Sequence, residues 1–364
     1  MDNRNDGVAE VFGWDTPPSA SPVLGVWAWS GTTWVRLADG GAATRIPGIS
    51  PPPRQFAATA YDTADHHLVL FGGNGAAPGA ATPMPVLNVP LLDTWIFDGS
   101  RWTRSAASRH PPASGPMVFD PLSGTILLVA NANFDLPPRP PPAERTWSWN
   151  GSSWRPLQPR TEIAPSAQVR DMAADPSTRT VVAVTACCGG SGPPTATQTW
   201  TWNGSTWSQQ HPTTELPPGL EFVMAYDPAS QRVLVVGNDG SDGAATTWAW
   251  DGSTWTALQP KTGAVFDPVT ATIATDPQRQ TVVLVTTLAG IQNTQVWNGS
   301  FWVEDSGTGP SGADTGSGAD TGYGTAAMYY GDATRQIVLL SSSADDFSRQ
   351  WMWTGDTWLQ LAPE

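Results

Sequence analysis

The sequence predicts an all-β protein: a β-propeller of seven blades, each with four antiparallel strands, in which the first blade is incomplete. Two repeated units predict this fold. The pattern aromatic-x-aromatic-x-Gly-x-x-Trp occurs seven times and contains 19 of the 20 tryptophans in the 364-residue chain. A second unit, in which two β-prone runs flank an acidic turn, occurs six times, between successive copies of the first. Two strand pairs in about 50 residues match one propeller blade better than one unit of a helical solenoid.

The tryptophan unit predicts a β-hairpin. Its first two aromatic positions are two residues apart, and side chains at this spacing point to the same side of a strand. An Asn-Gly or Asp-Gly pair follows in five copies. Such a pair accepts the positive φ angles of a type I′ turn, after which the closing tryptophan starts the returning strand. The copies begin at Trp27, Trp95, Trp147, Trp200, Trp248, Gln295 and Trp351, the sixth having glutamine in the first aromatic position.

The second unit predicts another hairpin. Asp-Pro separates the two β-prone runs in four copies, as at Asp227-Pro228. Proline supplies the fixed φ of a turn, and aspartate supplies a local hydrogen-bond acceptor. The Val/Leu-rich run that follows, such as Val233–Val236, is hydrophobic enough for a central buried strand. The tryptophan hairpin is therefore expected to form the outer pair of each blade.

We expect one propeller domain over residues 1–364. No segment shows a convincing 3.6-residue apolar period, and 35 prolines would interrupt most candidate helices. A partial first blade is expected at residues 1–37, and full blades are expected at residues 55–105, 114–157, 168–210, 220–258, 271–305 and 324–361.

The predicted hairpins do not add up to a closed ring of complete blades, because the sequence contains seven outer hairpins but only six inner ones. Before Trp27 only Val8–Phe12 offers a second strand, and no spare inner strand follows Leu361. Either the ring is open at this seam, or the first blade has lost strands that preceded Met1.

A strand ending at Phe71-Gly72-Gly73 is followed by Phe97 and, five residues later, by Trp102. With these residues the chain resembles the kelch-repeat family, in the degenerate form of galactose-oxidase-like propellers. The resemblance covers about residues 55–361 and departs from the kelch pattern because the diglycine occurs only at Gly72-Gly73. It implies a propeller fold and raises the alternative of a galactose-oxidase-like enzyme.

A copper radical oxidase of that kind needs two histidines, two tyrosines and a cysteine linked to a tyrosine. The chain has four histidines, and none of its tyrosines is adjacent to one. We interpret these histidines as solvated residues of turns and connections and predict no catalytic residue. They are His66, His67, His110 and His211.

The composition limits the classes of partner. The net charge is −14, and such an acidic surface repels phosphate backbones, so nucleic acid is not expected as a partner. No apolar run is long enough for a membrane span, and the first residues lack the apolar core of a signal peptide. The lysine-poor, Thr/Ser/Gly/Trp-rich composition resembles secreted or envelope kelch modules of bacteria, which implies an extracellular or cell-envelope location. A monomer is expected.

Six residues are candidate ligand-binding positions. Cys187 and Cys188 are adjacent, and in an oxidising compartment they would form a vicinal disulfide with an apolar face; the alternative is two reduced thiols that pack as small apolar side chains. Four carboxylates on predicted loops offer oxygen ligands to Ca²⁺, which needs six or more converging oxygens, and solvation is the alternative. They are Asp239, Asp242, Asp345 and Asp346. No other cofactor is predicted.

The predicted strand directions place all long connections on one face, including residues 74–93 and 105–114. A rigid scaffold often carries its binding site on such loops. The tryptophans recur in every blade, so we interpret them as packing between blades rather than as a sugar-stacking array. The main hypothesis is a non-catalytic scaffold that binds a glycan or a protein through the long-loop face. The alternatives are the galactose-oxidase-like enzyme and a ligand-sensing ectodomain of a longer protein.

Overall fold

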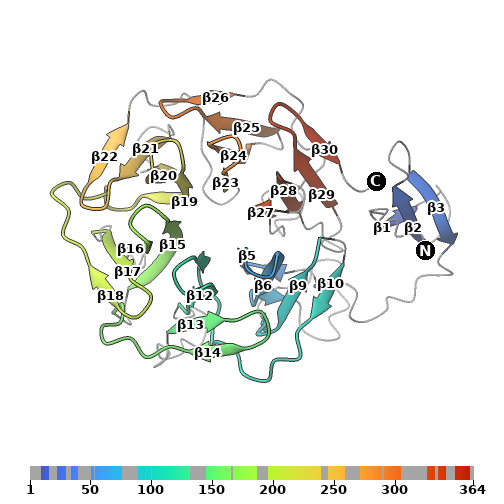
Figure 1. The fold of residues 1–364 in the computed structure, drawn as a ribbon, viewed down its shortest axis with the longest axis horizontal. Coiled ribbons are helices and arrows are strands. Elements are labelled where there is room, and N and C mark those ends of the chain that lie inside the picture. The colour runs from blue at the N-terminus through green and yellow to red at the C-terminus, as the bar shows by residue number, and fades with distance from the viewer. Residues whose placement is uncertain are drawn as a thin grey trace, which may run out of the picture.

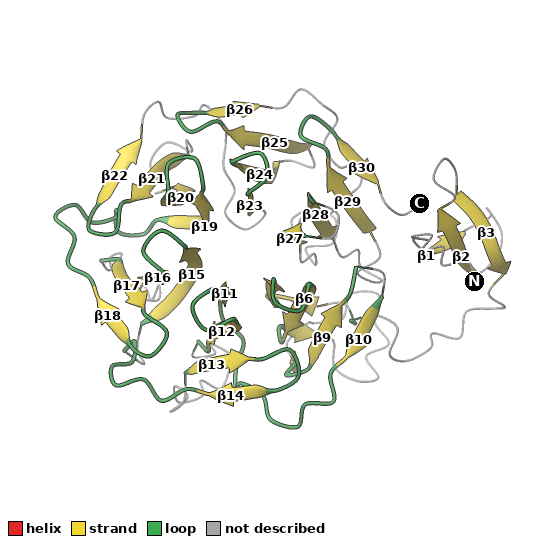
Figure 2. Ribbon diagram, in the orientation of Figure 1, coloured by secondary structure: helices red, strands yellow, loops and turns green. Residues whose placement is uncertain are grey.

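The structure is a computed structural model whose regular elements are all strands among the residues that it describes (Figure 2). No helix long and apolar enough to span a membrane occurs in this part of the chain. The described residues are 10–15, 23–29, 34–39, 51–52, 54–75, 89–99, 101–131, 145–164, 167–186, 196–238, 245–258, 271–288, 291–304, 326–332, 335–341 and 349–360.

Six four-stranded antiparallel sheets, numbered here as blades 1 to 6, stand around a common axis as a β-propeller (Figure 1). Blade 1 consists of β5 (Ala58–Asp62), β6 (His67–Phe71), β9 (Thr94–Phe97) and β10 (Trp102–Arg104). Blade 2 consists of β11 (Met117–Asp120), β12 (Thr125–Val129), β13 (Thr146–Trp149) and β14 (Trp154–Pro156). Blade 3 consists of β15 (Gln168–Asp175), β16 (Thr180–Ala186), β17 (Gln198–Trp202) and β18 (Trp207–Gln209).

The remaining three blades follow in chain order with the same internal connectivity. Blade 4 consists of β19 (Glu221–Asp227), β20 (Arg232–Asn238), β21 (Thr246–Trp250) and β22 (Trp255–Leu258). Blade 5 consists of β23 (Thr272–Asp276), β24 (Thr281–Leu288), β25 (Ile291–Trp297) and β26 (Trp302–Glu304). Blade 6 consists of β27 (Ala326–Gly331), β28 (Gln336–Ser341), β29 (Arg349–Trp353) and β30 (Trp358–Gln360).

Seven blades are not confirmed: the described residues form six. The first tryptophan hairpin, β2 (Val23–Trp29) and β3 (Trp34–Asp39), pairs with β1 (Glu10–Asp15) in a three-stranded sheet. This sheet lies outside the ring in Figure 1. A second three-stranded sheet, of β4 (Arg54–Gln55), β7 (Asn74–Gly75) and β8 (Val89–Pro90), adjoins blade 1.

The ring closes between blade 6 and blade 1, because β27 contacts β5 directly. The Tyr329 ring stacks on the Tyr61 ring with centroids 5.0 Å apart. Tyr329 also belongs to a buried cluster that contains Leu70 and Trp95 of blade 1. Six blades therefore complete the ring without the first tryptophan hairpin, which explains why seven outer hairpins alternate with six inner ones.

The outer strands form the predicted hairpins in every copy. The second aromatic residue pairs directly with the closing tryptophan, as in Trp149 with Trp154 and Trp202 with Trp207. These two ring pairs have centroids 5.3 Å apart. The turn differs from the predicted type I′: Asn150 pairs with Ser153, so the central residues are Gly151 and Ser152, and of these only Gly151 has a positive φ, of 87°. Positive φ at the first central residue of the turn is the requirement of type II′.

The aspartates that end the innermost strands are buried and hydrogen-bonded. Asp227 is fully buried, and its Oδ1 accepts from the Ala229 amide at 3.1 Å. Its Oδ2 accepts from the Ser230 hydroxyl at 2.7 Å and from the Trp297 indole of the next blade at 3.1 Å. The acidic turn thus fixes the inner hairpin and joins neighbouring blades.

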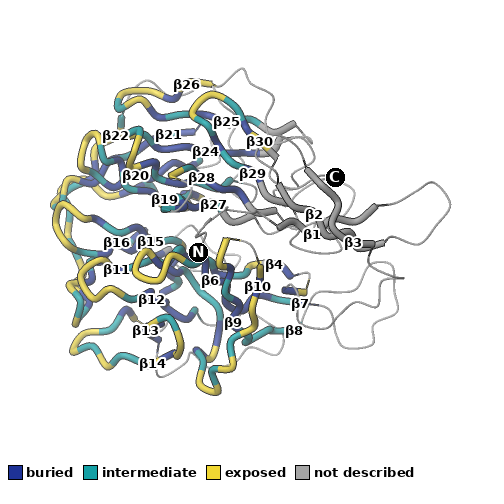
Figure 3. Tube along the Cα trace, turned by 45° about the vertical axis from the view of Figure 1, so that its right-hand side comes forward, coloured by how far each residue is buried: buried dark blue, intermediate teal, exposed yellow. Residues whose placement is uncertain are grey.

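The hydrophobic core lies between neighbouring sheets. One cluster combines Val69 and Phe71 of blade 1 with Ile126 and Trp149 of blade 2. Strand interiors are buried while many hairpin turns are exposed, as Figure 3 shows. Most described tryptophans are less than 9% exposed, which supports their interpretation as packing residues.

Candidate binding site

An open pocket of about 470 Å³ lies where β8 leads into β9 and where β10 leaves blade 1. These are the 74–93 and 105–114 connections, so the pocket lies on the predicted long-loop face. Its size suits a small polar ligand or one unit of a larger one. It is lined by Pro90, Leu91, Leu92, Asp93, Thr94, Arg104, Ser105, Ala106, Ala107 and His110.

Asp93 is fixed in this pocket by a buried arginine. The Arg54 side chain is fully buried, and its two terminal nitrogens donate to Asp93 Oδ1 at 2.6 Å and to Oδ2 at 3.1 Å. Asp93 Oδ2 also accepts from the Trp95 indole at 2.8 Å. Burial alone would raise the pKa of Asp93, but the hydrogen bonds and charge of Arg54 hold it below its usual value. Asp93 therefore remains a carboxylate.

The short sheet of β4, β7 and β8 explains why Arg54 reaches this position. Arg54 pairs with Gly75 in β7, and its guanidinium also donates to the Gly72 carbonyl at 2.9 Å. The Gly72 amide in turn donates to the Asp93 carbonyl at 3.1 Å. Gly72 has a φ of 72°, and an added Cβ would lie 3.1 Å from the Ser114 Cβ. Glycine at position 72 therefore allows the backbone to lie close to Ser114 beside the pocket.

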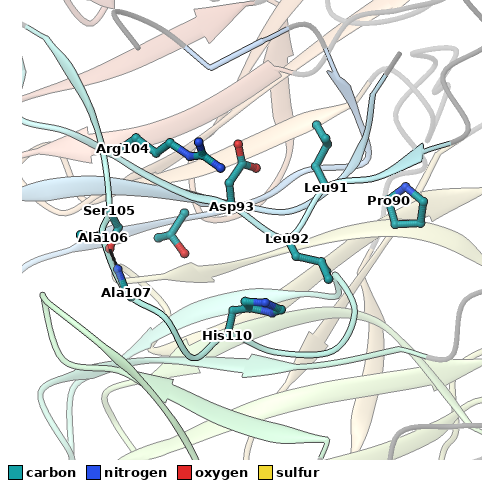
Figure 4. A pocket seen from close by; sticks show the side chains of 10 residues that line it. Pro90, Leu91, Leu92, Asp93, Arg104, Ser105, Ala106, Ala107 and His110 are labelled. Atoms are coloured by element: carbon teal, nitrogen blue, oxygen red, sulfur yellow. Dashed lines mark hydrogen bonds between the residues drawn. The ribbon is translucent and has the colours of Figure 1, made fainter. Parts of the chain in front are cut away.

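Arg104 comes from the outermost strand and is exposed. It pairs with Trp95 across the sheet, and the Ser105 amide donates to the Thr94 carbonyl at 2.8 Å. Figure 4 shows the side chains of Arg104 and Asp93 pointing toward one another. The positive charge of Arg104 contributes to the lowered pKa of Asp93. The pocket thus offers a guanidinium, a hydroxyl and a carboxylate to a ligand.

The pocket also touches the joint between blades 1 and 2. Thr94 is 5% exposed, and its Oγ1 accepts from the Trp154 indole of blade 2 at 2.8 Å. His110 is half-buried, with its Nδ1 2.9 Å from the Pro111 carbonyl oxygen. The neighbouring Arg109 places its guanidinium 5.6 Å from the centre of the Trp147 ring. Both blades therefore hold the rim of the pocket in place.

The six candidate residues from the sequence lie outside the described residues. They are Cys187, Cys188, Asp239, Asp242, Asp345 and Asp346. The structure instead brings together Asp93, Arg104 and His110 in one pocket. Of these three, the sequence predicts a role only for His110, as a solvated residue. One sequence signal was available: residues 99–119 contain no acidic residue, although the chain is acidic overall.

The geometry gives no metal centre of the oxidase kind in the described part of the chain, where no three His, Cys, Asp or Glu side chains are grouped suitably. His66 lies on the first turn of blade 1, with its Nδ1 3.2 Å from Asp332 Oδ2. His110 lies in the pocket, and His211 is an exposed residue after β18. The histidines are therefore placed in three separate regions.

Comparison with known proteins identifies the fold. The sequence matches no protein-family model and no curated protein, so the kelch resemblance is not shown. A mutant of AofleA from Arthrobotrys oligospora is similar with a TM-score of 0.52 and 10% identity, over 87% of this chain and 89% of that one.

Two further solved structures are similar at lower TM-scores. A fucose-specific lectin from Aleuria aurantia has a TM-score of 0.49 and 13% identity, over 86% of this chain and 97% of the lectin. A GH74 enzyme from Niastella koreensis has a TM-score of 0.48 and 14% identity, over 96% of this chain and 53% of the enzyme. At 10% identity, what this chain shares with AofleA is the β-propeller fold alone.

Proposed function

We propose that this propeller is a non-catalytic carbohydrate-binding protein that takes a sugar in the blade 1 pocket. The observation that carries the proposal is the combination of groups lining that pocket. Arg104 and Ser105 can donate hydrogen bonds to a ligand and Asp93 can accept one, beside the apolar side chains of Leu91 and Leu92. A sugar presents hydroxyls that need both donors and acceptors, and C–H faces that pack on apolar groups.

A binding role is favoured over glycoside hydrolysis by the chemistry of Asp93. Hydrolysis of a glycoside ordinarily uses two carboxyl groups, one of which donates a proton. Asp93 is the single acidic residue among the described residues that line the pocket. Arg54 and Trp95 hold it in the ionised form, so it is a poor proton donor.

The proposal is tested by measuring binding to a glycan array and by titration calorimetry on the saccharides that bind. Arg104→Ala should weaken binding by about tenfold or more, because it removes a charged donor from the site. Arg101→Ala is the matched control: Arg101 is an exposed arginine of the same blade, on the opposite turn, where it pairs with Asp98 at 3.3 Å. It should leave affinity unchanged.

Two outcomes contradict this proposal. One is that no saccharide binds the wild-type protein. The other is that Arg104→Ala binds the same saccharides with unchanged affinity, which would place the site elsewhere. Binding of a protein rather than a saccharide at this pocket would support the general hypothesis of a binding scaffold and would contradict the proposal that the ligand is a sugar. The extracellular or cell-envelope location and the resemblance to kelch repeats are predictions from the sequence.

A further inference from the structure

The blade 1 pocket has a charge opposite to that of the whole chain. The chain carries a net charge of −14 and has only 18 basic residues. Three of them, together with His110, fall within the acid-free segment 99–119. Arg104 and His110 line the pocket, and Arg109 precedes His110 directly. A locally basic pocket on an acidic protein selects ligands by the sign of their charge.

The carboxylate of Asp93 does not cancel this positive charge. Arg54 already pairs with it through both carboxylate oxygens, at 2.6 and 3.1 Å. The Arg54–Asp93 pair therefore has no net charge. The positive charge of Arg104, which lies on the solvent side of this pair, is the net charge of the group. Among the described lining residues no second acidic side chain balances Arg104.

The position of Arg109 adds to the same effect. Its guanidinium lies 5.6 Å from the centre of the Trp147 ring, an arrangement in which the ring face attracts the cation. Arg109 does not itself line the pocket, so it adds positive charge to the connection that carries His110 rather than a contact with the ligand. A planar guanidinium fork matches the geometry of a carboxylate, which it binds through two parallel hydrogen bonds.

We propose that the ligand is an acidic saccharide, in which the carboxylate of a uronic-acid unit binds Arg104 on the side of the pocket that His110 also lines. This inference rests on the proposed function and narrows its ligand class. The neutral hydroxyls of the same sugar unit contact Ser105 and Asp93, and its C–H face packs on Leu91 and Leu92. The acidic surface outside the pocket disfavours long polyanions, so a saccharide with isolated carboxylates fits best.

The test uses the full-length protein and matched pairs of methyl glycosides: glucuronic, galacturonic and mannuronic acid against glucose, galactose and mannose. At least one uronate should bind about tenfold or more tightly than its neutral partner. Raising the salt concentration should reduce this preference. Arg104→Gln, which keeps a donor but removes the charge, should abolish the preference, and Arg101→Gln should retain it.

The possible results separate this inference from the proposed function. If neutral sugars bind as tightly as their uronate partners, the inference is overturned while the proposed function stands. The same conclusion follows if Arg104→Gln keeps the full preference for uronates. If no saccharide of either kind binds, both are overturned. Circular dichroism of each variant checks that the fold is retained.

Discussion

The carboxylate of Asp171 lies between two neighbouring blades. It follows a β-bulge in β15, and its Oδ1 accepts from the Met172 amide at 2.8 Å. Its Oδ2 accepts from the Met224 amide of blade 4, also at 2.8 Å. Burial raises the pKa of Asp171 to about 7, because these two hydrogen bonds only partly offset the loss of hydration.

This shift predicts that stability depends on pH. The folded protein keeps the Asp171 proton up to about pH 7, whereas an unfolded chain releases it near about pH 4. The folded state therefore binds more protons in this window, and the free energy of unfolding falls as pH rises through it, with a slope of at most about 1.4 kcal/mol per pH unit. Urea denaturation at pH 5, 6 and 7 measures the slope.

Asp171→Asn should remove this part of the pH dependence. Asp356→Asn, at an exposed position in the last tryptophan hairpin, is the matched control and should leave the slope unchanged. If Asp171→Asn keeps the same slope as the wild type, another group causes the dependence and the account of Asp171 is wrong.

At the level of strands, an indole–threonine hydrogen bond joins five of the six pairs of neighbouring blades in the described residues. The closing tryptophan of one blade donates from Nε1 to the hydroxyl of a threonine in the third strand of the preceding blade. The bonds, 2.8–3.0 Å long, are Trp154 to Thr94, Trp207 to Thr146, Trp255 to Thr199, Trp302 to Thr247 and Trp358 to Thr294.

Removing one of these acceptors should destabilise the ring. Thr199→Val keeps the shape of the side chain but leaves the buried Trp255 indole without its acceptor, which should cost about 1–3 kcal/mol. Thr256→Val, at an exposed position of β22, is the control and should change stability by less than about 0.5 kcal/mol. Chemical denaturation measures both, and equal effects of the two variants would argue against the role of the indole bond.

The joint between blades 6 and 1 contains an aromatic contact. Gln350 stands at the sequence position that threonine occupies in blades 1 to 5. Here Tyr61 and Tyr329 stack, and the Asp332 amide donates to the Tyr61 hydroxyl at 3.3 Å. Aromatic stacking between the innermost strands β5 and β27 therefore contributes to this joint.

For the whole molecule, the contact of β27 with β5 predicts that the ring is independent of the first tryptophan hairpin. A variant that starts at residue 50 should keep a melting temperature within about 2–4 °C of the full chain. A variant that ends at residue 320 loses blade 6 and with it the buried partners Tyr329 and Val338 of the blade 1 cluster. It should melt at a much lower temperature or fail to fold.

Differential scanning calorimetry compares the two truncations. If the variant that starts at residue 50 unfolds as readily as the variant without blade 6, the sheet of β1, β2 and β3 contributes to the ring and the six-bladed account is wrong.

The sequence by itself determined the type and order of the strands. Period-two aromatic spacing and glycine turns defined the outer hairpins, and aspartate turns with β-branched runs defined the inner ones. These signals are local, because side-chain alternation and turn geometry depend on residues only a few positions apart. The sequence also shows a threonine before the first aromatic position of copies two to six. Its role as acceptor of a hydrogen bond depends on an indole of the next blade, which the sequence does not place.

Only the tertiary structure decided the number of blades and the place of the pocket. Ring closure depends on whether β27 packs on β5, a contact between strands more than 250 residues apart that no local pattern encodes. The pocket likewise brings Asp93, backed by Arg54, together with Arg104 and His110 from separate segments, and the acid-free segment 99–119 does not show that Asp93 and Arg54 lie beside it. A buried arginine that neutralises Asp93 and leaves Arg104 facing solvent is a property of their packing, so the sequence could locate the face but not the site.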